Sequence, residues 1–249
     1  MHPRPPGMPG AAGRTGHNGG PVSLRECCWQ AFPAATHTRH TVAMNSDMQD
    51  IAAAAARLIV EDGLDYRSAK QQAVHVLGLP SRTRVPDNDA VEAAVREHIA
   101  IFCADTQPGE LLALRKLALL WMGRLRPLRP FLTGAVWHGT ATRLTDVWLQ
   151  VFCDDAKAAE LWLINHGQRY DVGTTNGFKG ESVDVLSLSV PCTDLNEDIG
   201  IHLVVYDLDD LKGALRPDSQ GRKPRGDEAA VAHLVAASAY ELPPASSNV

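Results

Sequence analysis

The spacing of apolar residues changes once along this chain, near Pro127 and Pro130, and this change limits the folds that it can adopt. Before the two prolines, apolar residues recur every three or four positions, as on one face of an α-helix. After them, short stretches alternate apolar and polar residues, as in half-buried β-strands. A helical region followed by strands and helices predicts an α+β fold with a mixed sheet, rather than strict alternation of parallel strands and helices.

Four helices are expected before the prolines. The first is capped by Ser46 or Asp47 and runs through 51–60, the second covers 66–77, the third follows Asp87 or Asn88, and the fourth begins near Pro108. Around the end of the fourth helix lie Arg115, Lys116, Arg124, Arg126 and Arg129. These cations either complement the helix dipole or form a patch that faces phosphate.

After the prolines, strands are expected over 183–190 and 199–206, and a last helix over 229–238 behind the cap Asp227. A helix over 155–166 is expected to direct Ala158, Leu161, Trp162 and Ile164 inward.

Residues 1–43 have a different composition from the rest of the chain. They are rich in glycine and proline and show no helical or strand spacing. Such a segment cannot bury enough apolar surface to offset its backbone entropy, so we expect 1–43 to be disordered, or to be an extension from a start codon assigned too far upstream. We expect a helical region over 44–107, a sheet domain over 108–240 and a disordered tail over 241–249.

Composition excludes several classes of protein. The 249 residues carry a net charge of −5, which argues against a general nucleic-acid-binding protein because that role needs a basic surface. No stretch reaches the roughly 18 apolar residues of a membrane span, so we expect no membrane partner. The five cysteines form no CxxC pair, which argues against a zinc ribbon and favours a reducing, cytoplasmic location.

The most informative segment is 132–152. Leu132 and Thr133 precede Gly134 and Ala135, ten residues follow, and then come Asp146, Val147, Trp148 and Leu149. This pattern resembles the signature of the nucleotidyltransferase fold typified by polymerase beta. The resemblance is closest to short bacterial members of that fold that have a degenerate metal site.

The resemblance implies roles for particular residues. In that family a Gly-Ser turn, here Gly134 and Ala135, binds the phosphates of a nucleotide, because a backbone turn directs N–H groups at phosphate. Two carboxylates two residues apart on one strand, with a third from a later strand, bind Mg²⁺ through oxygen. Only Asp146 matches such a metal ligand here.

The chain departs from the family pattern at three places. Ala135 replaces the serine, Trp148 stands at the second carboxylate position, and the strand over 199–206 offers Gly200 and His202 where an acid is expected. Trp148 has no oxygen to give a metal. The resemblance therefore implies a degenerate module without transfer activity, and no cofactor is assigned beyond the Mg²⁺ that the family would use.

A loop over 216–226 supplies further candidate phosphate contacts, namely Arg222, Lys223 and Arg225. The module is therefore expected to bind a nucleotide, a polyphosphate or a protein partner. Two alternatives stay open. One is an active metal-dependent transferase that uses acids of the 184–210 stretch or His202 as relocated ligands, although that stretch is also typical of a solvated rim. The other is a protein-interaction scaffold built on the helical region.

Overall fold

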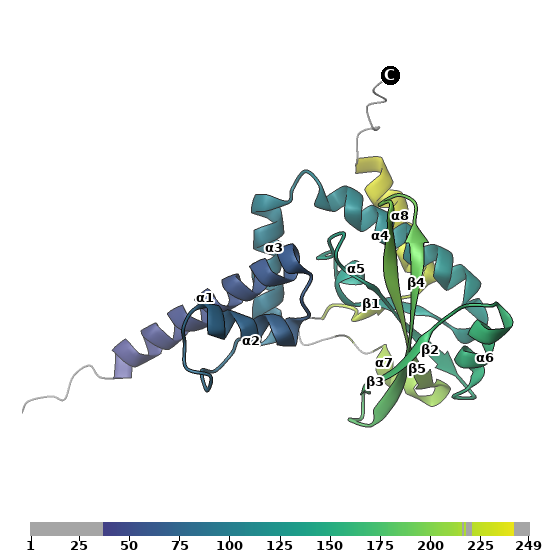
Figure 1. The fold of residues 1–249 in the computed structure, drawn as a ribbon, viewed down its shortest axis with the longest axis horizontal. Coiled ribbons are helices and arrows are strands. Elements are labelled where there is room, and N and C mark those ends of the chain that lie inside the picture. Colours follow the sequence, from purple (N-terminus) through teal and green to yellow (C-terminus); the bar gives the residue numbers. More distant parts are fainter. Residues whose placement is uncertain (1–36, 216, 218–220, 242–249) are drawn as a thin grey trace, which may run out of the picture.

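The computed structural model describes residues 37–215, 217 and 221–241, and the expectations for 1–36 and 242–249 lie outside them (Figure 1). The helices, in chain order, are α1 (His37–Asp62), α2 (Tyr66–Val76), α3 (Asn88–Phe102), α4 (Gln107–Arg124), η1 (Arg126–Leu128), α5 (Gly134–His138), α6 (Ala158–Asn165), η2 (Leu208–Asp210), α7 (Leu211–Ala214) and α8 (Glu228–Glu241). The strands are β1 (Phe131–Thr133), β2 (Val147–Cys153), β3 (Asp171–Asn176), β4 (Ser182–Cys192), β5 (Glu197–Asp207) and β6 (Arg225–Gly226).

The strands form one sheet in the order β3-β4-β5-β2-β1-β6. Strands β2 and β5 run parallel, and every other neighbouring pair is antiparallel. This mixed sheet confirms the expected α+β architecture. It also places β5, the strand expected to carry a third acid, directly beside β2, with Trp148 opposite His202.

One face of the sheet packs against α4 and α8. Because side chains alternate along a strand, the odd-numbered residues of β2 and β5 all point to this face. Leu149 and Leu203 are fully buried there against Leu114 and Trp121 of α4. Burying one leucine stabilises a fold by about 1.5–3 kcal/mol, so this layer holds the sheet on its helices.

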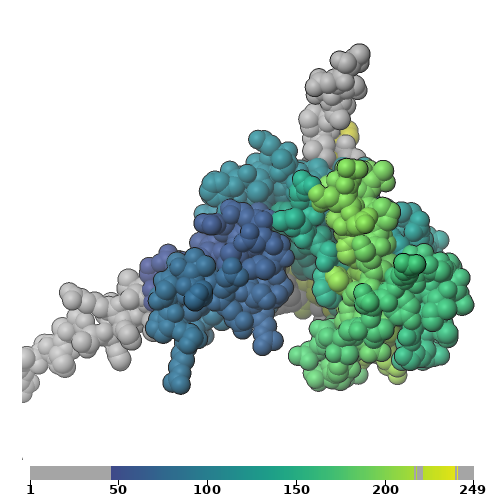
Figure 2. All heavy atoms as spheres, viewed as in Figure 1, coloured from purple at the N-terminus to yellow at the C-terminus, as the bar shows by residue number. Residues whose placement is uncertain are grey.

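Helices α1, α2 and α3 form a second cluster with its own core, in which Ile51, Ala55, Ala69, Val91 and Val95 are completely buried. The small alanine side chains let the helices pack closely. The caps expected at Asp87 and Asp227 are confirmed, because their carboxylates accept from the backbone N–H groups three residues on. The cap expected at Ser46 or Asp47 is wrong, because both residues lie inside α1. Figure 2 shows a cleft between this helical cluster and the sheet.

Helix α6 differs from its expectation in position and orientation. It begins at Ala158, and the Asp155 carboxylate accepts from the N–H of Lys157 in the turn before it. Ala158 and Trp162 pack against the core as expected, whereas Leu161 and Ile164 are 51% and 56% exposed and Leu163 is buried instead, so the inward face was predicted only in part. A helix of two turns touches the sheet along one narrow line, and apolar residues all around it do not reveal which line that is.

Three further features were not expected. Helix α1 begins already at His37, residues 134–138 form the short helix α5 rather than a plain turn, and β3 adds a strand at the sheet edge. Every residue of β3 is exposed, so it has no apolar alternation to reveal it. No helix in residues 37–215, 217 and 221–241 has the length and apolar character to cross a membrane.

Candidate functional site

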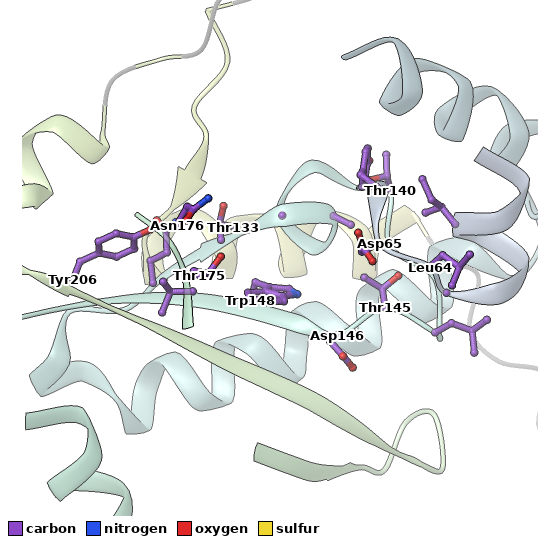
Figure 3. Close-up of a pocket in the computed structure, with 18 residues that line it drawn as sticks. Leu64, Asp65, Thr133, Thr140, Thr145, Asp146, Trp148, Thr175, Asn176 and Tyr206 are labelled. Carbon is purple, nitrogen blue, oxygen red and sulfur yellow. The ribbon is translucent and has the colours of Figure 1, made fainter. Parts of the chain in front are cut away.

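A pocket of about 520 Å³ lies between the helical cluster and the face of the sheet opposite α4 and α8 (Figure 3). The α1–α2 turn contributes Asp65 to its wall, and α2 contributes Tyr66. Asp146 lies just before β2, and Trp148 and Gln150 follow on that strand. These three residues alternate with the buried Val147, Leu149 and Val151, so all three project from the same face of the sheet.

The pocket has two chemically different ends. Figure 3 shows Asp65 and Asp146 at one end, Asn176 and Tyr206 at the other, and Trp148 between them. Among the described residues that line the pocket, none is lysine or arginine. Burial raises the pKa of Tyr66, so its phenol stays protonated at neutral pH and can donate a hydrogen bond.

The two carboxylates of the pocket already have partners. Asp65 caps α2, and its Oδ1 accepts from the N–H groups of Arg67 and Ser68 at 2.9 and 3.1 Å. The hydrogen bond from the Ser68 side chain is the main cause that lowers the pKa of Asp65. The Asp65 carboxylate is therefore anionic at neutral pH. Its negative charge at the N-terminus of α2 interacts favourably with the helix dipole.

Asp146 is held by β5. Its Oδ1 accepts from the N–H of Gly200 at 3.0 Å, and its Oδ2 lies 3.0 Å from Nε2 of His202. The hydrogen bond from His202 is the main cause that lowers the pKa of Asp146, and burial partly opposes it. Both oxygens are thus engaged by the protein itself.

Gly200 makes this arrangement sterically possible. A Cβ atom at this position would lie 2.6 Å from Cγ of Asp146, which is far inside van der Waals contact. Glycine at the position expected to carry an acid therefore serves the close approach of the Asp146 carboxylate to the β5 backbone.

Trp148 and His202 fill the face of the sheet beside Asp146. Their rings stack with centroids 4.3 Å apart and an interplanar angle of 29°. On its other side His202 presents Nδ1 to Oγ of Ser187 on β4, at 2.8 Å. The positions where the resemblance led us to expect further acids thus hold this stacked pair, and His202 also joins Ser187 of β4 to Asp146 through hydrogen bonds.

These residues do not fit the Mg²⁺ that the resemblance implies. A magnesium site needs oxygen ligands with near-octahedral geometry, whereas this position offers one carboxylate that is already bonded, an indole and an imidazole. Within the described ranges, no group of three or more His, Cys, Asp or Glu residues is arranged to hold a metal ion.

The expected phosphate residues lie in two separate places. Gly134 and Ala135 line the pocket at the start of α5, and Gly134 has φ of +71°, a backbone conformation that favours glycine. Arg222, Lys223 and Arg225 do not line it. Arg222 forms ion pairs with Glu92 and Asp89 of α3, so it links the β6 side of the sheet to the helical cluster.

Lys223 and Arg225 have different surroundings although they are two residues apart. The side chain of Lys223 is exposed, and its carbonyl accepts from Nε1 of Trp137 at 2.8 Å. Arg225 is only 8% exposed and donates from Nη1 to Oε1 of Gln150.

Three of the basic residues expected around the end of α4 bond to other parts of the protein. Arg115 is buried and donates from Nε to the carbonyl of Val136 at 3.2 Å, which ties α5 to α4. Lys116 pairs with Asp194 at 2.9 Å, and Arg126 pairs with Glu228 at 2.6 Å.

Sequence reasoning missed the contribution of the helical cluster to the pocket, because Asp65 and Tyr66 are distant in sequence from Asp146. It also missed the bonds of Ser187 and Gln150. One signal was present for Gln150, since a polar residue between apolar neighbours on β2 indicates a side chain that faces away from the main core.

Comparisons with known proteins identified no relative of this chain. Searches of protein-family models, of curated proteins and of solved structures each found no match to this chain.

Proposed function

We propose that this chain is a nucleotidyltransferase-like binding module that does not transfer nucleotides and that takes a nucleotide or phosphate ligand into the pocket between the helical cluster and the sheet. The observation that carries this proposal is the double engagement of Asp146 by Gly200 and His202. A carboxylate whose two oxygens accept protein hydrogen bonds is a poor ligand for a catalytic metal pair.

The pocket supports binding of a ligand with a flat, hydrogen-bonding part. Its volume lies within the usual 300–1,000 Å³ of small-molecule sites. Trp148 is 37% exposed and offers aromatic surface at the centre, where a base can stack for about 1–3 kcal/mol. Thr140 and Thr145 offer hydroxyls to the pocket, and the hydroxyl of Thr140 also contacts the phenol of Tyr66.

The acids of the 184–210 stretch do not favour the alternative of a transferase with relocated ligands. Three of them form ion pairs with basic residues, namely Asp194 with Lys116, Glu197 with Arg143, and Asp210 with Lys179. In each pair the acid binds a basic side chain of the protein, so it is not available as a metal ligand beside Asp146.

Calorimetry with ATP, CTP, GTP and UTP, each with and without Mg²⁺, tests the proposal. We expect binding of at least one nucleotide that does not require the metal, with no release of pyrophosphate. Trp148→Ala should weaken this binding about tenfold, which corresponds to the loss of one stacked contact. Trp162→Ala is the matched control, because Trp162 stacks on His166 of the α6 segment and does not line the pocket. Mg²⁺-dependent turnover of any of the four nucleotides would overturn the proposal.

A further inference from the structure

Arg225 is a buried cation that pairs with none of the carboxylates in the described part of the chain. Its side chain lies on the pocket face of the sheet, since it pairs in register with Thr133 of β1, which lines the pocket. The residue is only 8% exposed, and its Nε atom is buried without a hydrogen-bond partner. Among the described residues no carboxylate forms an ion pair with it, in contrast to Arg222 in the same loop.

The groups around the Arg225 guanidinium are neutral. Nη1 donates to the amide oxygen of Gln150. The cation lies 4.7 Å from the centre of the Phe178 ring, which itself stacks on Tyr206 at 4.1 Å. An amide and an aromatic face compensate a buried charge only in part, and a buried cation with a free donor is costly unless an anion joins it.

Arg225 does not line the pocket itself but lies beside Gln150, which lines the pocket at the end away from the acids and accepts a hydrogen bond from Nη1 of Arg225. Gln150 and Tyr206 both line the pocket, and Tyr206 lies at the end opposite Asp65 and Asp146 (Figure 3). Asp146 and Gln150 are four residues apart along β2, which at 3.3 Å per residue is a separation of about 13 Å. One small molecule can reach both ends.

We infer that Arg225 anchors an oxyanion group of the pocket ligand, a phosphate or a carboxylate, and that the same ligand directs hydrogen-bond donors at Asp146 and Asp65. The inference rests on the proposed function, because it takes this pocket as the ligand site. It assigns the anion to the Arg225 end rather than to the turn at Gly134 and Ala135. Arginine suits this role because its planar fork of N–H donors matches the oxygens of such groups.

The first test uses the anion alone. Inorganic phosphate and sodium acetate are titrated into isotopically labelled wild-type protein while the Nε–Hε resonance of Arg225 is followed by NMR. At least one of the two anions should shift this resonance in a saturable manner and raise Tm. Arg225→Gln should abolish the rise in Tm, and Arg225→Lys should keep part of it, because lysine keeps the charge but loses the fork. The control Arg126→Gln should respond like wild type, since Arg126 pairs with Glu228 outside the pocket.

The second test uses a ligand, AMP, that carries a phosphate and a flat base in one molecule. AMP and adenosine are compared by calorimetry on the wild type, Arg225→Gln and Arg126→Gln. AMP should bind the wild type and Arg126→Gln at least tenfold more tightly than adenosine does, and Arg225→Gln should bind the two equally.

The outcomes separate the inference from the function. If neither AMP nor adenosine binds but an anion shifts the Arg225 resonance, the nucleotide proposal fails and the anion site stands; a response to acetate alone indicates a carboxylate ligand. If AMP and adenosine bind the wild type equally, the function stands and the anchor role of Arg225 is overturned. An Arg225 resonance that neither anion shifts also overturns it, and this measurement needs no variant to fold.

Discussion

The Nε2 atom of His202 lies 3.0 Å from Oδ2 of Asp146, and this contact joins β5 to the residue just before β2 on the pocket side of the sheet. Because the carboxylate can only accept, Nε2 carries the proton, and in the neutral ring Nδ1 then accepts from the hydroxyl of Ser187 at 2.8 Å. The protein thus supplies the hydrogen-bond partners of Asp146 from β5.

Replacing His202 should destabilise the fold. His202→Phe keeps a ring to stack on Trp148 but removes the donor to Asp146, so the free energy of unfolding should fall by about 1–3 kcal/mol, the cost of leaving a partly buried charged group without its partner. Urea denaturation followed by circular dichroism measures this loss.

Ser187→Ala is the milder comparison for His202→Phe. It removes only the neutral hydrogen bond to Nδ1, so about 0.5–1.5 kcal/mol should be lost. Equal losses for the two variants would show that the bond to Asp146 contributes little.

A methyl group at Gly200 should break the contact between β5 and Asp146. The added Cβ would lie 2.6 Å from Cγ of Asp146, so Gly200→Ala should cost about 1–3 kcal/mol through overpacking. Gly213→Ala is the matched control, because an added Cβ there meets nothing within 4 Å. In the Asp146→Ala background the clash disappears, and a double-mutant cycle should show a smaller penalty for Gly200→Ala. If Gly200→Ala costs the same free energy of unfolding with and without the Asp146 carboxylate, the close approach of the two residues is contradicted.

Stability should decline in acid in a way that depends on Asp146. The hydrogen bond from His202 lowers the pKa of Asp146 in the folded state. The folded state therefore binds the proton less readily than the unfolded chain, and the stabilisation is fully present above the unfolded pKa of about 3.9. It is lost as the pH falls through the folded pKa. Between pH 6 and pH 2.5 the free energy of unfolding should fall less steeply for Asp146→Asn than for the wild type. Parallel curves for the two proteins would show that ionised Asp146 does not contribute to this pH dependence.

Two adjacent cations of α4 should differ in their effect on stability. Arg115→Ala removes a buried guanidinium that donates to the carbonyl of Val136, so it should cost about 1–3 kcal/mol and speed amide hydrogen exchange in α5. Lys116→Ala breaks only an exposed pair with Asp194 and should cost at most about 1 kcal/mol. Unchanged exchange in α5 for the Arg115 variant would show that the contact does not hold this helix.

The sequence by itself determined those helices and strands that depend only on residues close together in the chain. The caps Asp87 and Asp227 and the alternation along β5 were readable, because a helix start depends on neighbouring residues and a buried strand on its own spacing. The inward face of α6 and the exposed strand β3 were not readable, because both depend on what packs beside them.

The sequence by itself also determined that Trp148, Gly200 and His202 stand where the resemblance led us to expect acids. Only the tertiary structure decided what those residues do instead: His202 and Gly200 bind the carboxylate, and Asp65 brings a second acid from another part of the chain. It also decided that, of Arg222, Lys223 and Arg225, Arg225 is the buried one. The physical reason is that pairing across strands and burial depend on distances in space, which residue order does not specify.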